Sequence, residues 1–205
     1  MKLRPGDRLY LITDAARAAH PIEHIIGEAC GAGLRMAQIR DKNLDDGPYA
    51  AAAHAVIRAA RAHDARILLN GRAHLVRETA ADGVHLPSLH SVADARVVVG
   101  RDSLVGYSAH TEAELRRATE GCADFVTLSP VFPTASKPGA RALGLALFAN
   151  MTSACALPVF ALGGVTAANA AACLDAGAYG VAVCGAIVGD QDPAAATSDL
   201  LEALR

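Results

Sequence analysis

Short apolar runs alternate with helical patterns eight times along this chain of 205 residues, and the alternation limits the folds available to it. Short apolar runs are typical of buried parallel strands, and a helix after each strand supplies the crossover that parallel strands need. The pattern predicts a compact (β/α)8 TIM barrel that forms a single domain over residues 1–205. The predicted strands cover residues 9–13, 36–40, 67–70, 83–86, 104–108, 125–129, 159–162 and 181–183.

A doubly wound open sheet is the alternative architecture. Such a sheet usually has fewer strands and carries a glycine-rich loop after its first strand. Residues 14–20, which follow the first predicted strand, contain no glycine. The barrel is therefore the favoured fold.

Capping residues mark the starts of several predicted helices. Thr111 is followed three residues later by Glu114, which is the pattern of a capping box. Thr166 can cap the alanine-rich helix after the seventh strand, and Pro193 suits the first turn of the last helix. These signals place helices between the predicted strands.

The charge balance argues against several classes of partner. The chain has 19 basic and 21 acidic residues, and it shows no basic arm or aromatic stacking surface. We therefore expect no nucleic acid partner. The N-terminal residues lack the apolar core of a signal peptide, and no run approaches the roughly 18 apolar residues of a membrane span. We expect a cytoplasmic protein with no membrane partner.

No spacing of cysteines or histidines indicates a metal site. The five cysteines stand singly, without a CxxC pair. Six histidines lie on predicted helices or loops without the spacing of metal ligands. We therefore predict no bound metal and no cofactor.

Two glycine loops follow the last two predicted strands. Gly163 and Gly164 end the seventh apolar run, and Cys184 with Gly185 ends the eighth. Glycine loops at neighbouring parallel strands can point backbone N–H groups at one anion, and barrels of this kind commonly bind phosphate there. We predict a phosphate-binding site at these four residues, with tight turns that bind nothing as the alternative.

Polar residues close the other predicted strands and should meet at one mouth of the barrel. Arg40 and Lys42 can hold an anionic substrate group, unless they are only a solvated pair. His110 is predicted to be catalytic because an imidazole transfers protons near neutral pH, whereas a structural histidine bonded to a carbonyl is the alternative. His85 could point into the mouth or into the core. The predicted substrate-binding residues are Gln38, Arg40, Lys42, Asn70, Ser108, Thr134, Ser136 and Lys137, the last three on a long loop.

Four groups of residues, taken together, resemble the thiamine-phosphate synthase/TenI superfamily over nearly the whole chain. The resemblance implies a compact (β/α)8 barrel that binds thiazole phosphate or a related thiamine precursor. It also implies a homodimer or another small homo-oligomer. The residues that carry it are Gln38-Ile-Arg-Asp-Lys42, Ser108-Ala-His110, Pro130-Val-Phe-Pro-Thr134 with Ser136-Lys137, and Gly163-Gly164 with Val183-Cys-Gly-Ala-Ile187.

The two main branches of this superfamily differ in their need for a metal. The synthases join a pyrimidine diphosphate to thiazole phosphate, and Mg²⁺ on two aspartates holds the pyrophosphate. One aspartate follows the asparagine after the third strand, as Asn-Asp-Asp, and the other lies a few residues beyond the fourth strand. At these places the present chain reads Asn70-Gly71-Arg72 and Leu86-Pro-Ser-Leu-His90. Neither stretch offers Mg²⁺ a carboxylate.

At these two places, where carboxylates are missing, the chain resembles the TenI branch. The characterised members of this branch move a proton on a thiazole carboxylate phosphate without a metal. The resemblance implies a thiazole tautomerase, an isomerase of thiamine biosynthesis, in which Arg40 faces the carboxylate and His110 moves the proton. Gln38 and Lys42 instead match the synthase pattern, in which they hold the pyrimidine diphosphate. A Mg²⁺-dependent thiamine-phosphate synthase and a non-catalytic regulator that binds a thiazole or thiamine phosphate are the alternatives.

Overall fold

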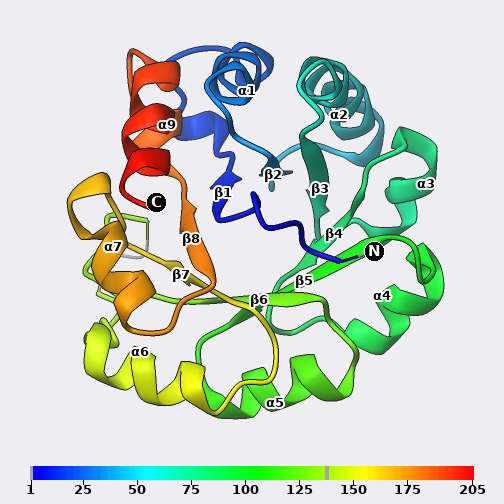
Figure 1. Cartoon of the computed structure of the whole chain (residues 1–205). Helices are drawn as coiled ribbons and strands as arrows, with labels where there is room; N and C mark the ends of the chain where they lie inside the picture. The colour runs from blue at the N-terminus through cyan, green and yellow to red at the C-terminus, as the bar shows by residue number, and fades with distance from the viewer. Residues whose placement is uncertain (1, 137–138) are drawn as a thin grey trace.

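The computed structural model describes residues 2–136 and 139–205, and its centre is a closed barrel of eight parallel strands. The strands pair in chain order, and β8 pairs with β1 to close the barrel (Figure 1). The predicted (β/α)8 barrel is confirmed, and each strand ends within one residue of its predicted limits. The strands are β1 (Leu9–Ile12), β2 (Met36–Ile39), β3 (Arg66–Asn70), β4 (Gly83–Leu86), β5 (Leu104–Ala109), β6 (Phe125–Leu128), β7 (Val159–Leu162) and β8 (Gly180–Val183).

Helices surround the barrel, and several begin at the predicted capping residues (Figure 1). Glu114 N–H donates to Thr111 Oγ1 at 3.2 Å, and the Glu114 carboxylate accepts from Thr111 N–H at 3.1 Å. Two short elements, η1 (Ala15–Arg17) and α8 (Gly185–Val188), were not predicted, because three or four residues show no helical period. The helices are α1 (Ile22–Gly31), α2 (Asp46–Arg61), α3 (Val76–Thr79), α4 (Val92–Val99), α5 (Glu112–Glu120), α6 (Gly144–Ser153), α7 (Ala167–Asp175), α8 (Gly185–Val188) and α9 (Pro193–Glu202), with 3-10 turns η1 (Ala15–Arg17) and η2 (Ala73–Leu75).

Alternate residues of each strand face opposite sides of the barrel wall. Leu9 and Leu11 of β1 pack towards the helices, whereas Tyr10 packs inside the barrel with Phe125 and Phe160. The centroids of these three rings lie 5.4 to 5.9 Å apart. Aromatic rings at such distances fill the interior. The barrel is therefore a packed core rather than a channel.

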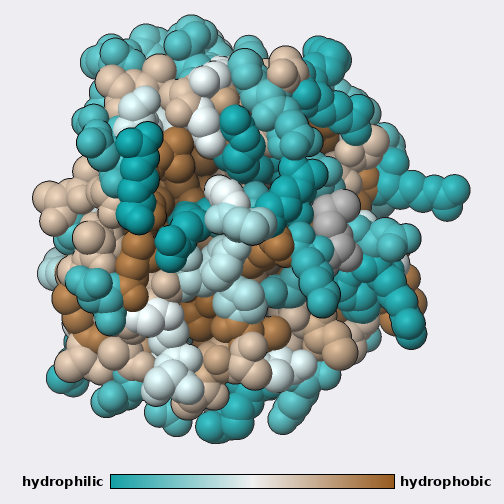
Figure 2. All heavy atoms as spheres, viewed as in Figure 1, coloured by the Kyte–Doolittle hydropathy of each residue, from teal (hydrophilic) through white to brown (hydrophobic). Residues whose placement is uncertain are grey.

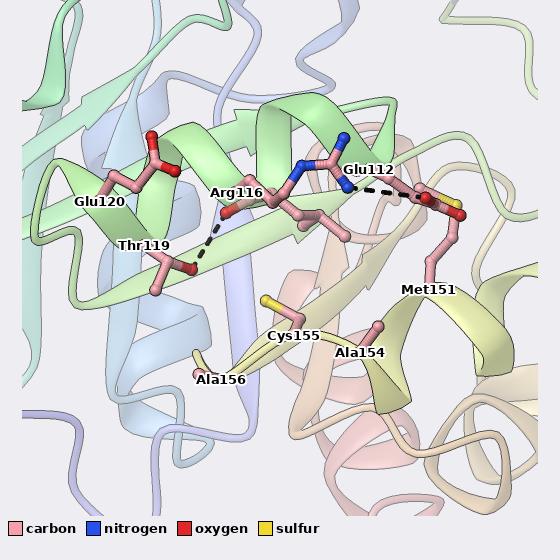
Figure 3. A pocket seen from close by; sticks show the side chains of 9 residues that line it. Glu112, Arg116, Thr119, Glu120, Met151, Ala154, Cys155 and Ala156 are labelled. Carbon is pink, nitrogen blue, oxygen red and sulfur yellow. Dashed lines mark hydrogen bonds and ion pairs between the residues drawn. The ribbon is translucent and has the colours of Figure 1, made fainter.

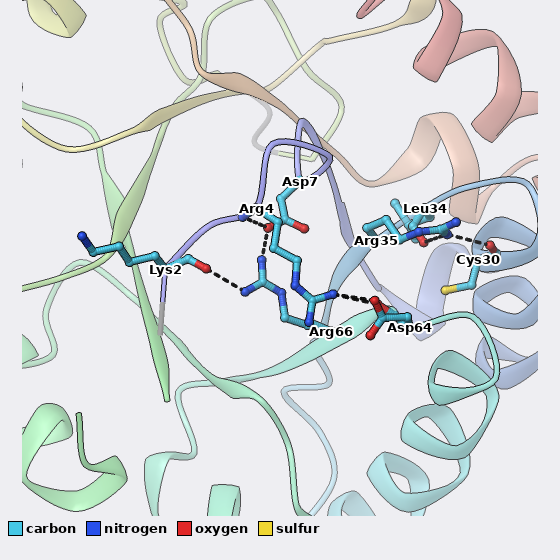
Figure 4. Close-up of polar contacts among 8 residues, drawn as sticks. All are labelled: Lys2, Arg4, Asp7, Cys30, Leu34, Arg35, Asp64 and Arg66. Atoms are coloured by element: carbon cyan, nitrogen blue, oxygen red, sulfur yellow. Dashed lines mark hydrogen bonds and ion pairs between the residues drawn. The ribbon is translucent and has the colours of Figure 1, made fainter. Parts of the chain in front are cut away.

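The N-terminal segment crosses the end of the barrel at which the strands begin (Figure 1). Asp7 and Arg66 form an ion pair there, and both residues are buried. Arg66 also donates to the carbonyl oxygen of Lys2 at 3.0 Å, and Asp7 accepts from the N–H of Arg4 (Figure 4). These contacts tie the segment across this end, so a ligand site is expected at the opposite end.

Figure 2 shows hydrophilic side chains along the upper and right edges of the face it draws, with apolar atoms at its centre and left edge. Large apolar side chains that stand exposed in the described chain are Leu89, Val97, Val98 and Leu147. No helix formed by the described residues has the length and apolar character needed to cross a bilayer.

Candidate active site

A cavity of about 650 Å³ opens at the end of the barrel where the strands finish. Every strand contributes to its wall through its last residues or the loop that follows. A cavity of this size can hold a small organic ligand. Of the predicted site residues, those that line it are Gln38, Arg40, Lys42, Asn70, Ser108, His110, Thr134, Ser136, Gly163, Gly164, Cys184 and Gly185.

The predicted site is thus brought together wherever the structure describes it. Lys137 lies outside the described residues. The roles of the lining residues towards a ligand stay predictions.

Three cationic side chains and one carboxylate gather at the β1–β2 sector of the mouth: Arg17, Arg40, Lys42 and Asp14. Asp14 Oδ2 lies 3.4 Å from Arg40 Nη1 and 3.7 Å from Arg17 Nε. The backbone N–H of Arg40 donates to Thr13 Oγ1 at 2.9 Å, which joins the ends of β1 and β2. Because this sector holds three cations and one carboxylate, it is net positive and attracts an anionic ligand group.

The sequence analysis did not select Asp14 or Arg17 as site residues. Asp14 follows β1, and the short η1 turn brings Arg17 to the cavity wall. Arg17 Nη2 donates to the carbonyl oxygen of Ala135 at 2.8 Å, which links the first loop to the long loop after β6. The signal in the sequence was Arg17, a cation three residues after Asp14, which follows the first apolar run. Arg17 lies in a turn of three residues, which is too short to show helical periodicity.

Gln38 and Asn70 place two side-chain amides in the cavity wall. Asn70 Nδ2 donates to Gln38 Oε1 at 3.4 Å. The hydroxyl of Tyr49 accepts from Asn70 N–H at 3.1 Å and donates to the carbonyl oxygen of Ile39 at 2.7 Å. Amides both donate and accept, so this part of the wall can bind either kind of ligand atom.

Arg72 is not part of the cavity wall and instead holds the loop after β2. Its Nη1 donates to the carbonyl oxygen of Asp41 at 3.0 Å, and its Nε donates to Asp46 Oδ1 at 2.9 Å. Its Nη2 donates to the carbonyl oxygen of Leu44. Since this loop carries Lys42, Arg72 fixes one of the cations that line the cavity.

His110 is held by β6 on one side and by the start of α5 on the other. Its Nδ1 lies 2.7 Å from the carbonyl oxygen of Ser129 and 3.2 Å from the Ser129 hydroxyl. A carbonyl can only accept, so Nδ1 carries the hydrogen and any proton exchanged with a ligand passes through Nε2. The backbone N–H of His110 donates to the Glu114 carboxylate at 2.6 Å. His110 is therefore both bonded to a carbonyl and part of the cavity wall.

Gly163 and Gly164 have φ angles of +98° and +67°, which favour glycine. The loop after β6 packs directly on them, and the N–H of Phe132 donates to the carbonyl oxygen of Gly163 at 3.0 Å. A Cβ added to Gly164 would lie 2.5 Å from the carbonyl oxygen of Pro133. Both the backbone angles and the packing of this loop therefore require glycine.

Cys184 and Gly185 begin the short helix α8 at the end of β8. The first N–H groups of a helix have no acceptor within the helix. A Cβ added to Gly185 would meet nothing within 4 Å, so this backbone is open to close approach. Burial raises the pKa of the Cys184 thiol to about 11, and the negative charge of Asp14 acts in the same direction. The thiol stays protonated, so the backbone is the part suited to an anion.

The residues present do not fit a Mg²⁺ ion of the kind that the synthase resemblance implies. Gly71 has no side-chain oxygen, and its backbone N–H donates to the carbonyl oxygen of His85 at 2.9 Å. Asp14 is the one carboxylate among the described residues that line the cavity, and it lies beside two guanidinium groups that repel a dication. Over residues 2–136 and 139–205, no three His, Cys, Asp or Glu side chains cluster closely enough to hold a metal.

A second, smaller cavity of about 200 Å³ lies outside the barrel between α5 and the end of α6 (Figure 3). Its polar groups include Glu112 and Arg116, which pair with each other at 3.8 Å and are exposed. Thr119 Oγ1 donates to the carbonyl oxygen of Leu115 at 3.1 Å within the same helix. These groups are engaged with one another, and we assign this cavity no role.

Comparison with known proteins places most of the chain in one family. Residues 9–187 match the family model described as thiamine monophosphate synthase. A putative thiamine-phosphate synthase 2 from Aquifex aeolicus is 35% identical over 85% of this chain and 94% of that protein. A thiamine-phosphate synthase from Prochlorococcus marinus is 39% identical over 88% of this chain, and the chain spans 51% of its length. A thiamine phosphate pyrophosphorylase structure from Pyrococcus furiosus has a TM-score of 0.88 at 27% identity and covers 98% of this chain and 96% of its own.

These relatives correct one prediction from the sequence. Their names describe synthases and a pyrophosphorylase, which are transferases, and none of those reported is named a tautomerase. The prediction of a thiazole tautomerase, an isomerase, was therefore wrong. It depended on two short stretches without carboxylates, whereas the similarity to synthases extends over nearly the whole chain.

Proposed function

Since the chain belongs to the thiamine monophosphate synthase family, we propose that it joins a hydroxymethylpyrimidine diphosphate to thiazole phosphate as a transferase. The observation that carries this proposal is one cavity with two sectors suited to anions. One sector consists of the backbone at Gly163–Gly164 and Cys184–Gly185, and the other consists of Arg17, Arg40 and Lys42. This reaction brings two phosphorylated substrates together, and each sector can hold the phosphate groups of one of them.

The positions of the two sectors in the barrel suit two substrates. The glycine sector lies at the ends of β7 and β8, and the cationic sector follows β1 and β2, which are the next strands around the barrel. We assign the thiazole phosphate to the glycine sector, where N–H groups at a helix start and at glycine turns can donate to its oxygens. The diphosphate goes to the cationic sector, where guanidinium groups bind phosphate oxygens in pairs.

The proposed reaction forms one bond and breaks one. The thiazole ring nitrogen supplies the electron pair that forms a C–N bond to the methylene carbon of the pyrimidine. The C–O bond to the diphosphate breaks, and its electron pair leaves with pyrophosphate. Arg17, Arg40 and Lys42 stabilise the charge that develops on the leaving group. His110 lies in the same cavity wall, where its Nε2 can exchange a proton with a ligand.

The proposal includes no metal ion, because the residues around the cavity do not form a magnesium site. Arg40 and Lys42 lie in the cavity wall with Arg17. Side-chain cations can therefore balance the charge of the leaving group in this chain.

The test is formation of thiamine phosphate from the two purified substrates, measured with added Mg²⁺ and with EDTA. We expect product at rates that agree within about twofold in the two conditions. Product that requires Mg²⁺ would overturn the metal-free part of the proposal. No product in either condition, with both substrates shown to bind by calorimetry, would overturn the transferase.

A non-catalytic phosphate-binding protein is the second candidate. The observation that favours it is the glycine at position 71 and the lack of carboxylates in residues 87–90. This candidate predicts binding of thiazole phosphate in calorimetry and no turnover. The same pair of experiments therefore separates it from the transferase.

A further inference from the structure

His85 of β4 lies inside the barrel, one layer below the mouth. The sequence left its direction open, and the structure buries it between the rings of Tyr10 and Phe125, each 5.6 Å away between centroids. Burial lowers the pKa of His85 to about 3, and no charged side chain is among these neighbours. At neutral pH the ring is therefore uncharged, with one nitrogen that donates and one that accepts.

The two ring nitrogens have different surroundings. Nε2 lies 3.0 Å from Ser108 Oγ and 3.5 Å from Thr127 Oγ1. Nδ1 is buried and has no hydrogen-bond partner among the described residues. Ser108 lines the cavity, so the bond from Nε2 joins the buried ring to the ligand site.

Two tautomers are possible, and they give Ser108 opposite roles. If Nδ1 carries the hydrogen, Nε2 accepts the hydroxyl hydrogen of Ser108, and a buried N–H is left without a partner. If Nε2 carries the hydrogen, it donates to Ser108 Oγ, and only a lone pair is left unpaired at Nδ1. In that case the Ser108 hydroxyl hydrogen is available to another acceptor.

Gly106 of β5 distinguishes between the two tautomers. A Cβ built on Gly106 would come within 2.5 Å of His85 Nδ1. The same Cβ would lie 2.4 Å from Phe125 Cζ, so the hydrogen that glycine carries in that direction faces both Nδ1 and the edge of the Phe125 ring. A C–H group makes a weak favourable contact with a lone pair but would be crowded by an N–H. This contact favours a bare Nδ1 and a hydrogen on Nε2.

We propose that His85 is a positioning residue that fixes the Ser108 hydroxyl as a hydrogen-bond donor into the cavity. The ligand atom opposite Ser108 is then an acceptor, such as an unprotonated ring nitrogen or an oxygen, and not an amino group. The proposal rests on the proposed function for the identity of the ligand. The pyrimidine of that function is an aminopyrimidine, which carries both ring nitrogens that accept and an amino group that donates. The state of His85 itself can be tested without a ligand.

The first experiment measures the imidazole nitrogens by NMR in ligand-free protein labelled with ¹⁵N, between pH 5 and pH 8. The signals of His85 are identified by their loss in the His85→Gln variant. We expect a hydrogen on Nε2, a bare Nδ1 and no titration over this range. A hydrogen on Nδ1, or a doubly protonated ring, would overturn the proposal whatever the protein catalyses.

The second experiment is a double-mutant cycle with His85→Leu and Ser108→Ala. We expect each single variant to weaken binding of hydroxymethylpyrimidine diphosphate by about tenfold, which corresponds to the loss of one hydrogen bond. In the Ser108→Ala background, His85→Leu should add less than about twofold, because its effect passes through Ser108. Independent losses that multiply would show a merely structural role and contradict the proposal.

Matched variants keep this experiment interpretable if His85→Leu folds poorly. His85→Gln retains a group that can donate to Ser108 Oγ, and we expect it to restore most of the lost affinity. Thr127→Val removes only the longer contact of 3.5 Å and should bind as the unaltered protein does. If a folded His85→Gln variant binds as weakly as Ser108→Ala, donation to Ser108 is not the role of His85.

Discussion

The ring of His110 on the turn after β5 is joined to the backbone of Ser129 after β6, with Nδ1 2.7 Å from the carbonyl oxygen. Because the acceptor is a main-chain atom, no substitution at position 129 removes it. The bond sets the direction of the ring across the mouth of the cavity. It also makes the contributions of the two residues separable by mutation.

Replacing His110 with Asn tests the role of its Nε2. The Asn side chain can still donate to the Ser129 carbonyl but lacks the second ring nitrogen. We expect the rate of thiamine phosphate formation to fall by about 100-fold or more, with substrate affinity nearly unchanged. Ser129→Ala keeps the carbonyl and should reduce the rate far less. Equal losses in the two variants would contradict a role for His110 Nε2, because Ser129→Ala leaves that nitrogen in place.

The glycines of the phosphate sector differ in what they tolerate. Gly164→Ala places a Cβ 2.5 Å from the carbonyl oxygen of Pro133 at a φ of +67°, whereas Gly185→Ala meets nothing within 4 Å. We expect Gly164→Ala to lower the free energy of unfolding by about 1–3 kcal/mol. Gly185→Ala should change it by less than about 0.5 kcal/mol. Urea denaturation of both variants measures this, and equal stabilities would contradict the packing of the loop on Gly164.

The Asp7–Arg66 pair at the closed end of the barrel is expected to stabilise the fold without taking part in activity. Removing one partner leaves a buried, unpaired charge, so Arg66→Met should cost about 3–5 kcal/mol. The double variant Asp7→Leu with Arg66→Met removes both charges and should lose less. Denaturation gives the stabilities. The turnover per folded molecule should stay within about twofold, and a larger fall would show that this end influences the site.

Arg72 is expected to act on substrate binding through the loop that carries Lys42. Arg72→Gln removes donors to the carbonyl oxygens of Asp41 and Leu44, so the loop becomes less ordered. We expect the KM for the pyrimidine diphosphate to rise about tenfold, the cost of roughly 1.4 kcal/mol in binding, with little change in kcat. Arg77→Gln, an exposed change on α3, is the matched control. An unchanged KM would contradict the anchoring role.

The buried His85 predicts how stability depends on pH. Its pKa is about 3 in the folded protein, against an ordinary value of 6.5. Below pH 6.5 the unfolded chain therefore binds a proton that the folded protein does not, so stability falls as the pH falls. This group alone should remove about 2 kcal/mol between pH 7 and pH 5.

Denaturation at the two pH values checks this. The loss in His85→Gln should be smaller by that amount, whereas His54→Gln, an exposed change, should behave as the unaltered protein. An identical pH dependence for His85→Gln and the unaltered protein would contradict the low pKa of His85.

Much of the fold could be predicted because the spacing of apolar residues along the sequence indicates which residues of a strand or helix are buried. The eight apolar runs gave the strand limits to within one residue, and Thr111 with Glu114 marked the start of α5. The rule that barrel sites lie at the strand ends then grouped Arg40, His110 and Gly164 correctly around one cavity. Arg17 was not predicted as a site residue, because a turn of three residues shows no helical periodicity.

The reaction class was the weakest inference from the sequence. The stretches Asn70–Arg72 and Leu86–His90, which lack carboxylates, bear on whether the chain binds a metal. They were also taken to decide between an isomerase and a transferase. A site with several cations can balance the charge of a diphosphate in another way, and the whole-chain similarity to synthases carries more information than two positions.

The sequence by itself determined the order of strands and helices, the glycine turns and the residue types at the mouth, because these depend on neighbours along the chain. Only the tertiary structure decided the partner of each polar group. Arg72 holds a loop instead of lining the cavity, and His85 points into the core while reaching Ser108 on the next strand. Such pairings join strands whose register is set when the barrel closes, and no local pattern of residues encodes them.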